Sequence, residues 1–460
     1  MGWRAPVNPG VMGSMPRRVV AIAVVVVAAA LVGAIPVAAA STPDLVPFTD
    51  TGDLYFVDDT TDQILKANAA GQVSIVVTKQ QQLQAIPNTT LAEMVEPSLA
   101  FDGESSLYWM VRLRISNVDR YTLFRWRPAT GNVEVVTTAQ QIEAATRVKG
   151  AQAQNFAIAP DGTIYLAEET ADAVVAINST TGEALLFASN AALRAVVPGS
   201  PVSLDAPPVV DAAGNVHVPN EHEPSEFFTI TPAGVVSALA DKVNEIQAIA
   251  TTATGGTFQL TFNGEQTAPI ARTASRVNIK AAIEALASID QVRVTGAGTT
   301  AGPWLVEFRG SLADADVAPM TILASGLTPE GSTATVTTAV NGGDLGDVDT
   351  FVTLDYAGRI TMIDDVFHWI MTRTLDGYVS SLFTRYQLEA ANGDVVSLDS
   401  GLAWADDGSL YLIEDHRDRI YRITPDGTFT RFLVGAQVRA ATGQTVHEFE
   451  GGLAFANGAA

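Results

Sequence analysis

The sequence predicts an all-β fold, a six-bladed β-propeller closed by a C-terminal strand and carrying a small inserted α+β domain. Two observations favour it: a hairpin turn that recurs along the chain, and a linker that recurs between the hairpins. The hairpin turn is present in six copies: DTGDLYFVDD (50–59), FDGESSLYWMV (101–111), PDGTIYLAEE (160–169), AAGNVHVPNE (212–221), YAGRITMIDD (356–365) and DDGSLYLIED (406–415). Internal repeats of this length are typical of propellers and solenoids.

Most hairpins are followed by two more strand-like runs that a glycine turn separates, as in AVVAINSTTGEALLFA and RIYRITPDGTFTRFLV. Runs of Val, Ile, Tyr and Leu bounded by Gly or Asp-Gly indicate strands in hairpins. With the strand that precedes each hairpin they give four strands per unit, which is one propeller blade. Four tyrosines recur in the matching strand, and we expect this stripe to pack between blades: Tyr55, Tyr108, Tyr165 and Tyr411.

The linkers between units predict short helical turns: QQLQAIPN, QQIEAATR, AALRAVVPG, NEIQAIATTATGG, YQLEAANG and AQVRAATG. Their central apolar residues are Leu83, Ile142, Leu193, Ile246, Leu388 and Val438, at spacings of 59, 51, 53, 142 and 50. The one long interval predicts an inserted module at 251–343. Residues 41–250 then form blades 1–4, and residues 344–460 form blades 5 and 6 with the closing strand.

The inserted segment has a different pattern, in which GGTFQLTFNGEQTAPIA predicts a hairpin and SRVNIKAAIEALASI predicts an amphipathic helix. Ser275 is the expected N-cap, and Ile279, Ile283 and Leu286 share one helical face. Three further strands follow, so we expect an α+β module. On GTFQLTFNGEQTAPIARTAS and AAIEALASI it resembles a module of bacterial surface proteins and phage tail proteins. That resemblance implies contact with a protein or cell-surface partner, or a spacing role.

The end of the chain predicts how the ring closes. EFEGGLAFANG (448–458) copies the inner strand in VEPSLAFDG (95–103), yet no hairpin follows it. The first blade, by contrast, lacks a good copy of this strand. A C-terminal strand that completes the N-terminal blade would close the ring and leave no free sheet edge.

The N-terminal segment predicts a bacterial-type secretory signal peptide over residues 1–40. Arg17 and Arg18 precede an uncharged apolar run that ends in three alanines, and we expect cleavage near Ala40. The alternative is a retained membrane anchor, since residues 19–40 are long enough to span a bilayer. The protein is therefore expected to be secreted or extracytoplasmic.

The composition restricts the class of partner. The chain has 27 basic and 50 acidic side chains, a net charge of −23, and no cysteine. Loss of residues 1–40 removes three arginines and no acid, which gives −26. Such a surface disfavours nucleic acid and favours cations. Without cysteine, disulfides and thiolate chemistry are excluded. We expect a monomer that binds no nucleic acid.

An acidic position recurs immediately before the inner strand of each blade. The residues aligned there are Glu96, Gln154, Asp205, Asp349, Asp399 and Glu450, with Asn155 beside Gln154 as a neutral ligand. Because inner strands line the channel of a propeller, we expect these side chains around one channel mouth. Converging carboxylates repel unless a cation or shared protons neutralise them. Oxygen ligands in a flexible ring favour Ca²⁺ over Mg²⁺ or Mn²⁺.

The competing interpretation is that these acids only accept hydrogen bonds from backbone amides of turns. It is the favoured interpretation for a second set of polar residues, which end the following strand on the same face of the ring. This set comprises Asp58 and Asp59, Glu168 and Glu169, Asn220 and Glu221, Asp364 and Asp365, and Glu414 and Asp415. Blade 2 departs from the pattern with Val111 and Arg112.

The repeat GLAWADDGSLYLIEDHRDRIYRITPDG is similar to NHL-repeat and gluconolactonase-like six-bladed propellers. The lactonase group holds a divalent cation in the channel with a Glu, an Asn and an Asp from different blades. The resemblance implies Glu96, Asn155 and Asp205 as the matching residues, although the surrounding sequence departs from that group's motifs.

Two function hypotheses follow. The first is an extracytoplasmic binding or scaffold protein whose channel takes a divalent cation, or a cationic or small-molecule ligand. The second is a metal-dependent hydrolase or lactonase that acts in the channel. A general base is needed for the second, and His447 and His416 are the candidates on the acid-rich face.

Overall fold

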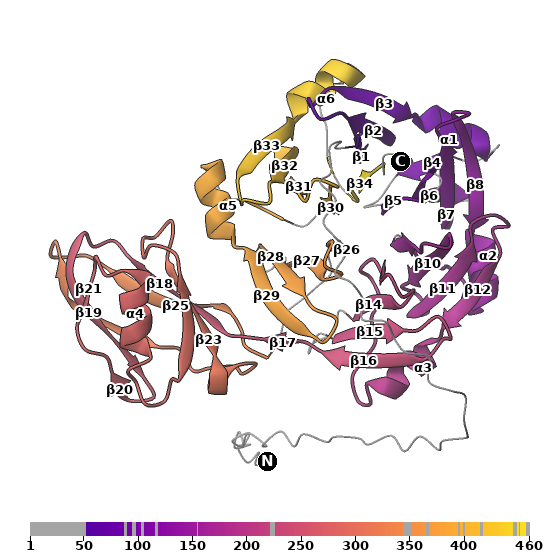
Figure 1. Ribbon diagram of the computed structural model, residues 1–460. Helices are drawn as coiled ribbons and strands as arrows, with labels where there is room; N and C mark the ends of the chain where they lie inside the picture. The colour runs from indigo at the N-terminus through magenta and orange to yellow at the C-terminus, as the bar shows by residue number, and fades with distance from the viewer. Residues whose placement is uncertain are drawn as a thin grey trace, which may run out of the picture. The chain divides into compact units, whose positions relative to one another are not determined.

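Antiparallel sheets built from the repeated unit form a ring around a central channel in the computed structural model of the protein (Figure 1). The structure describes residues 52–86, 90–93, 98–102, 105–115, 118–153, 155–220, 226–343, 351–364, 368–393, 396–398, 401–414, 417–444, 449 and 451–456. Within these residues the ring has six blades, as predicted. The fold is therefore an all-β propeller.

Each blade is a meander whose innermost strand comes first in the chain, except in blade 1, where the innermost strand is C-terminal. From inner to outer, blade 1 has β34 (Ala454–Phe455), β1 (Leu54–Asp58), β2 (Gln63–Ala67) and β3 (Val73–Val77). Blade 2 has β5 (Leu99–Phe101), β6 (Leu107–Ile115), β7 (Val118–Arg127) and β8 (Asn132–Thr138), with β4 (Thr90–Glu93) beside β6. Blade 3 has β9 (Phe156–Ile158), β10 (Thr163–Glu168), β11 (Ala173–Asn178) and β12 (Ala184–Ala188). Blade 4 has β13 (Val209–Val210), β14 (Val216–Asn220), β15 (Glu226–Ile230) and β16 (Val236–Ala240); blade 5 has β26 (Val352–Leu354), β27 (Ile360–Asp364), β28 (Trp369–Arg373) and β29 (Tyr378–Phe383); blade 6 has β30 (Leu402–Trp404), β31 (Leu410–Glu414), β32 (Arg419–Ile423) and β33 (Phe429–Val434).

The hairpin turns explain why Asp-Gly recurs. In blade 3, the carboxylate of Asp161 accepts a hydrogen bond from the Thr163 amide at 2.9 Å. Gly162 follows with φ of 83°, a left-handed conformation that costs glycine little. The same arrangement returns in blade 6, where Asp407 accepts from the Ser409 amide at 2.8 Å.

The C-terminal strand closes the ring, as predicted. In β34, Ala454 pairs with Tyr55 and Phe455 pairs with Leu54, so β34 becomes the inner strand of blade 1. The ring of Phe455 also packs edge-on against Tyr411 of blade 6, with 5.0 Å between centroids. The closing strand therefore joins the first and last blades of the chain.

The tyrosine stripe packs between blades, which confirms the prediction. Tyr55, Tyr108, Tyr165 and Tyr411 are each 8% exposed or less. Tyr411 belongs to a cluster that includes Leu54 of the next blade, and Tyr108 to one that includes Phe156. Alternate residues of a strand thus pack against opposite neighbouring blades, as in β1, where Leu54 and Phe56 lie in one apolar cluster and Tyr55 and Val57 in another.

Five of the predicted linkers form short helices outside the blades: α1 (Lys79–Ala85), α2 (Ala139–Thr146), α3 (Asn190–Val196), α5 (Arg385–Asn392) and α6 (Gly435–Thr442). The sixth prediction, around Ile246, is wrong. Ile246 begins strand β18 (Ile246–Thr251), which pairs on both sides, with β23 (Trp304–Arg309) and β25 (Ala334–Val340). An isolated helix this short is marginal, and pairing on two edges of a strand outweighs it.

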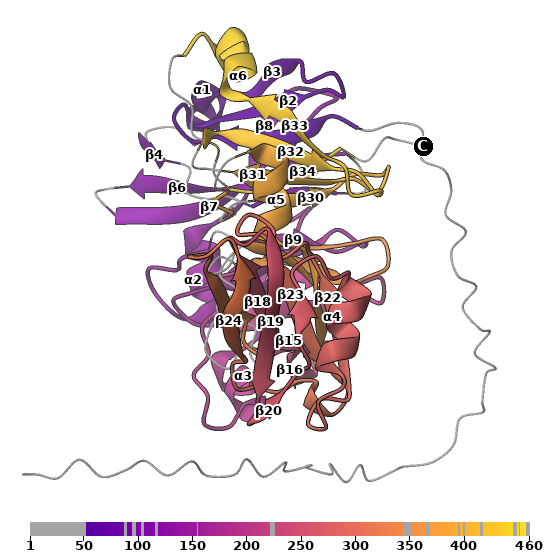
Figure 2. The same cartoon turned by 90° about the vertical axis from the view of Figure 1, so that its left-hand side faces the viewer.

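The inserted segment therefore begins at β18, ahead of the predicted start at Thr251. One of its sheets has the order β22 (Gln291–Thr295), β23, β18 and β25. The second contains β19 (Gly255–Phe262), β20 (Glu265–Gln266), β21 (Ile270–Ala271) and β24 (Thr321–Thr328). Helix α4 (Arg276–Ile283) lies against β22 (Figure 2), and a short 3₁₀ helix, η1 (Gly310–Leu312), follows β23.

Helix α4 begins where predicted but ends at Ile283, so the predicted helical residue Leu286 lies beyond it. The Ser275 hydroxyl accepts a hydrogen bond from the Asn278 amide at 3.3 Å, which is an N-cap. Ile279, Ile283 and Leu286 are buried in one cluster with Trp304. The segment thus has an apolar core of its own between its two sheets and the helix.

The interface between blades 4 and 5 contains buried charge. Arg373 of β28 forms an ion pair with Asp241, and each side chain is 1% exposed. The same guanidinium donates to the Leu239 carbonyl at 2.9 Å and lies 4.4 Å over the ring of Phe227. Asp241 directly precedes β17 (Lys242–Val243), which pairs in parallel with β29. This ion pair therefore ties the end of blade 4 to blade 5 where the inserted segment begins.

Candidate functional site

The inner strands enclose a cavity at the centre of the ring. Each of β34, β5, β9, β13, β26 and β30 contacts the inner strand of both neighbouring blades. Together with the residues just before them they line a space of about 470 Å³. Ser98 lies at its wall among apolar residues such as Phe156, Pro207 and Leu402. Most side chains on the wall are thus apolar, and Ser98 and Thr353 are the hydroxyl-bearing residues among those that line it.

Asn155 contacts residues of the two neighbouring blades. Its side chain is buried at the start of β9, and its Oδ1 accepts a hydrogen bond from the Ser98 hydroxyl of blade 2 at 3.1 Å. Its Nδ2 donates to the backbone carbonyl of Asp205, which leads into blade 4. The Asp205 side chain is exposed. The structure therefore places the Asn155 side chain against the backbone of Asp205, the other predicted ligand among the described residues.

The other predicted site residues fall outside the described residues. They are Glu96, Gln154, Asp349, Asp399 and Glu450 among the acidic ring, and His416 and His447 among the candidate bases. In the described part of the chain, no three His, Asp or Glu side chains come close enough together to hold a metal ion.

Ser98 is the residue of this site that the sequence prediction missed. It occupies the position that glycine takes in two other blades, at Gly401 and Gly452, so its hydroxyl is a departure from the repeat. That departure, two residues after Glu96, was the available signal. Because Ser98 donates to Asn155, it fixes the orientation of the amide at the channel mouth.

In blades 3 and 4, the polar residue that ends the second strand supports the loop that leads into the channel. Glu168 is fully buried and accepts hydrogen bonds from the amides of Gln152, Thr170 and Ala171 at 2.9, 3.1 and 2.8 Å. Burial raises the pKa of Glu168, although these amide hydrogen bonds act in the opposite direction. The favoured interpretation, backbone hydrogen bonding, is thus confirmed for this position.

In blade 4, the neutral side chain of Asn220 makes the corresponding hydrogen bonds to the backbone. Its Oδ1 accepts from the Ser203 amide at 2.9 Å, and its Nδ2 donates to the Pro201 carbonyl at 3.2 Å. Glu168 and Asn220 each hold the segment that precedes an inner strand. They therefore help to position the segments that carry Asn155 and Asp205.

Comparisons with known proteins bear only on the fold. No protein-family model and no curated protein sequence matches the chain. Among solved structures, it resembles TolB from Acinetobacter baumannii, with 11% identity over 89% of this chain and 67% of that chain and a TM-score of 0.41. A streptogramin B lyase has 10% identity, coverage of 79% and 89%, and a TM-score of 0.38. Regucalcin, a calcium-binding protein from Agrobacterium tumefaciens, has 12% identity, coverage of 57% and 75%, and a TM-score of 0.29.

The part of the chain that the structure describes contains no helix with the length and apolarity needed to cross a bilayer.

Proposed function

We propose that the protein is an extracytoplasmic binding propeller whose channel mouth takes a divalent cation, with Ca²⁺ as the preferred ion. The observation that carries this proposal is the meeting of three blades at Asn155. Its amide contacts Ser98 on one side and Asp205 on the other. Glu96, the third predicted ligand, is two residues before Ser98 in the chain.

The donor atoms fit a hard cation. An amide oxygen has two lone pairs, and Ser98 uses one of those on Asn155 Oδ1. The exposed Asp205 carboxylate adds two oxygens. Ca²⁺ accepts six to eight such oxygen ligands, with water completing the shell. A cation there would also reduce the repulsion between carboxylates that approach the channel axis.

Calorimetric titration of Ca²⁺ into chelator-stripped protein tests this proposal. We expect one-site binding to the wild type, a loss of affinity of about tenfold or more in Asp205→Asn, because a charged ligand is lost, and wild-type affinity in Glu330→Gln. The latter removes the same charge from an exposed position of the inserted segment. The proposal is wrong if the wild type gives no heat and melts at the same temperature in calcium and in chelator.

The hydrolase or lactonase activity stays a prediction, since His447 and His416 lie outside the described residues. A protein that binds Ca²⁺ should be assayed against lactones and esters. Turnover that is lost both in chelator and in a His447→Gln, His416→Gln variant would establish the hydrolase. The extracytoplasmic location is tested separately, by mass spectrometry of the exported protein, for which we expect a mature N-terminus near residue 41.

A further inference from the structure

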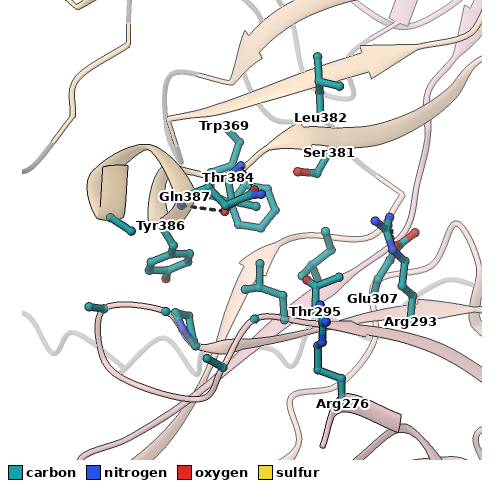
Figure 3. A pocket seen from close by; sticks show the side chains of 18 residues that line it. Arg276, Arg293, Thr295, Glu307, Trp369, Ser381, Leu382, Thr384, Tyr386 and Gln387 are labelled. Carbon is teal, nitrogen blue, oxygen red and sulfur yellow. Dashed lines mark hydrogen bonds and ion pairs between the residues drawn. The ribbon is translucent and has the colours of Figure 1, made fainter. Parts of the chain in front are cut away.

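A second cavity, of about 500 Å³, lies between the inserted segment and blade 5 (Figure 3). Strand alternation explains which side chains reach it. In β22 and β23, Val292, Val306 and Phe308 point into the core of the inserted segment. Arg293 and Leu305 alternate with them and line the cavity. The opposite wall comes from β28, β29 and α5.

The walls of this cavity, called here the junction pocket, are held by hydrogen bonds. On one side, the loop 296–303 is fixed by backbone hydrogen bonds from Ala297 to Gly302 at 3.2 Å and from Thr251 to Gly298 at 3.1 Å. On the other, Thr384 and Gln387 form a capping box at the start of α5 (Figure 3). A pocket whose walls are already ordered loses little conformational entropy when a ligand enters.

The floor of the junction pocket is apolar. Trp369, Leu305 and Ile246 line it, and they are 1%, 8% and 7% exposed. These residues belong to one cluster that spans the inserted segment and blade 5. A cavity of this volume with an apolar floor at the junction of two parts of a chain is typical of small-molecule sites.

The rim of the junction pocket is positively charged in an acidic chain. Glu307 receives two hydrogen bonds from Arg309, at 2.9 and 3.1 Å, and one from Asn244 at 3.0 Å. Arg293 approaches the same carboxylate at 3.5 Å, the longest of these contacts. Arg276 lines the rim as well and makes no ion pair with any described residue. Because Arg309 already neutralises Glu307, Arg276 and Arg293 supply a net positive charge to a ligand.

We propose that the junction pocket binds a small organic anion with an aromatic or branched apolar body, of the class of aryl carboxylates. The body packs on Trp369 and Leu305, and the anionic group accepts hydrogen bonds from Arg276 and Arg293. A guanidinium fork can pair with two oxygens of a planar carboxylate or of a tetrahedral sulfonate. This site shares no residue with the channel mouth, so each can fail without the other.

The probe is 8-anilinonaphthalene-1-sulfonate, an aromatic anion, with N-phenyl-1-naphthylamine as its uncharged counterpart. We expect one fluorescent site for the anion in wild-type protein. In the Arg276→Gln, Arg293→Gln variant its Kd rises about tenfold or more, because charge-assisted hydrogen bonds are lost. The uncharged probe changes less than about threefold, since the apolar floor remains. The control, Lys149→Gln with Arg431→Gln, removes two exposed charges elsewhere and keeps wild-type binding of both probes.

A second variant fills the pocket. Ala390 is exposed on α5 and lines the cavity, so Ala390→Trp should weaken both probes without unfolding the blade. If that variant does not fold by circular dichroism, Ala297→Trp serves in its place, since Ala297 is an exposed loop residue of the opposite wall. The proposal is overturned if the wild type has no single anion site, if the double arginine variant binds the anion as the wild type does, or if the filled pocket still binds both probes.

Discussion

The two faces of blade 4 meet their neighbours by different means. Toward blade 3, Val218, Phe228 and Ile230 join an apolar cluster with residues such as Tyr165. Toward blade 5, the alternating residues include His217 and Phe227, and Phe227 lies under the guanidinium of Arg373. One interface is thus closed by dispersion and burial, and the other combines burial with an ion pair and directed hydrogen bonds.

The charged interface is the one at which the inserted segment interrupts the ring. Asp241, which pairs with Arg373, ends the blade 4 part of the chain, and β17 follows it. We infer that the buried ion pair fixes the return of the chain at this place, whereas blades 3 and 4, which follow each other directly, pack mainly through apolar side chains.

The largest effect is expected from Asp241→Asn. It leaves the buried Arg373 charge without its carboxylate, and breaking such a pair costs about 3–5 kcal/mol of unfolding free energy. Urea denaturation measures it. The double variant Asp241→Leu, Arg373→Met should be less destabilised than Asp241→Asn alone, because no isolated charge stays buried. Equal or greater destabilisation in the double variant would contradict this account of the interface.

The second effect concerns the apolar interface. Ile230 is fully buried between blades 3 and 4, and Ile230→Ala should cost about 2–5 kcal/mol of unfolding free energy through lost burial and a cavity. Ile230→Val keeps most of the buried surface and should cost only about 0.5–1.5 kcal/mol. Urea denaturation measures both variants, and a cost for Ile230→Val as large as that of Ile230→Ala would contradict an interface closed by burial.

The third and smallest effect is a pH dependence carried by His217. Its imidazole is 3% exposed, donates from Nε2 to the Asp211 carboxylate at 3.1 Å, and contacts the Thr229 hydroxyl at 3.0 Å. Burial lowers the pKa of His217, with the nearby Arg373 acting in the same direction and Asp211 against it. The unfolded chain therefore binds the proton more readily than the folded one.

The resulting stability is fully present above the unfolded pKa of His, about 6.5, and is lost as pH falls below it, by at most about 1.4 kcal/mol per pH unit. Urea denaturation at pH 5 and pH 8 should show a steeper loss for wild type than for His217→Gln. A steeper loss in the variant, or identical slopes, would show that the imidazole is not kept neutral by burial.

The repeat made the ring predictable, since each blade supplies independent copies of one pattern. The closing strand at Ala454 and Phe455 was read from its likeness to the strand at Leu99. The N-cap at Ser275 was equally local. Ile246 was misread because its partners on β23 and β25 lie far along the chain, and a short apolar run does not say whether it becomes helix or strand.

Some residues of the candidate sites were predictable from the sequence, and others were not. Alignment of the inner strands identified Asn155 and Asp205, which do meet. Ser98 was missed because it departs from the repeat, and an alignment emphasises what is shared. The junction pocket had no sequence signal at all, because Arg293 and Trp369 come together only through docking of the inserted segment on blade 5.

The central claim is a cation site where blades 2, 3 and 4 meet, and a crystal structure of the protein grown with Ca²⁺ tests it most directly. We expect an ion with Asn155 Oδ1 and the Asp205 carboxylate among its ligands. The distance from the ion to each oxygen should be about 2.4 Å, which is usual for calcium. Ordered water at that position under saturating Ca²⁺, with Asp205 turned to solvent, would contradict the claim.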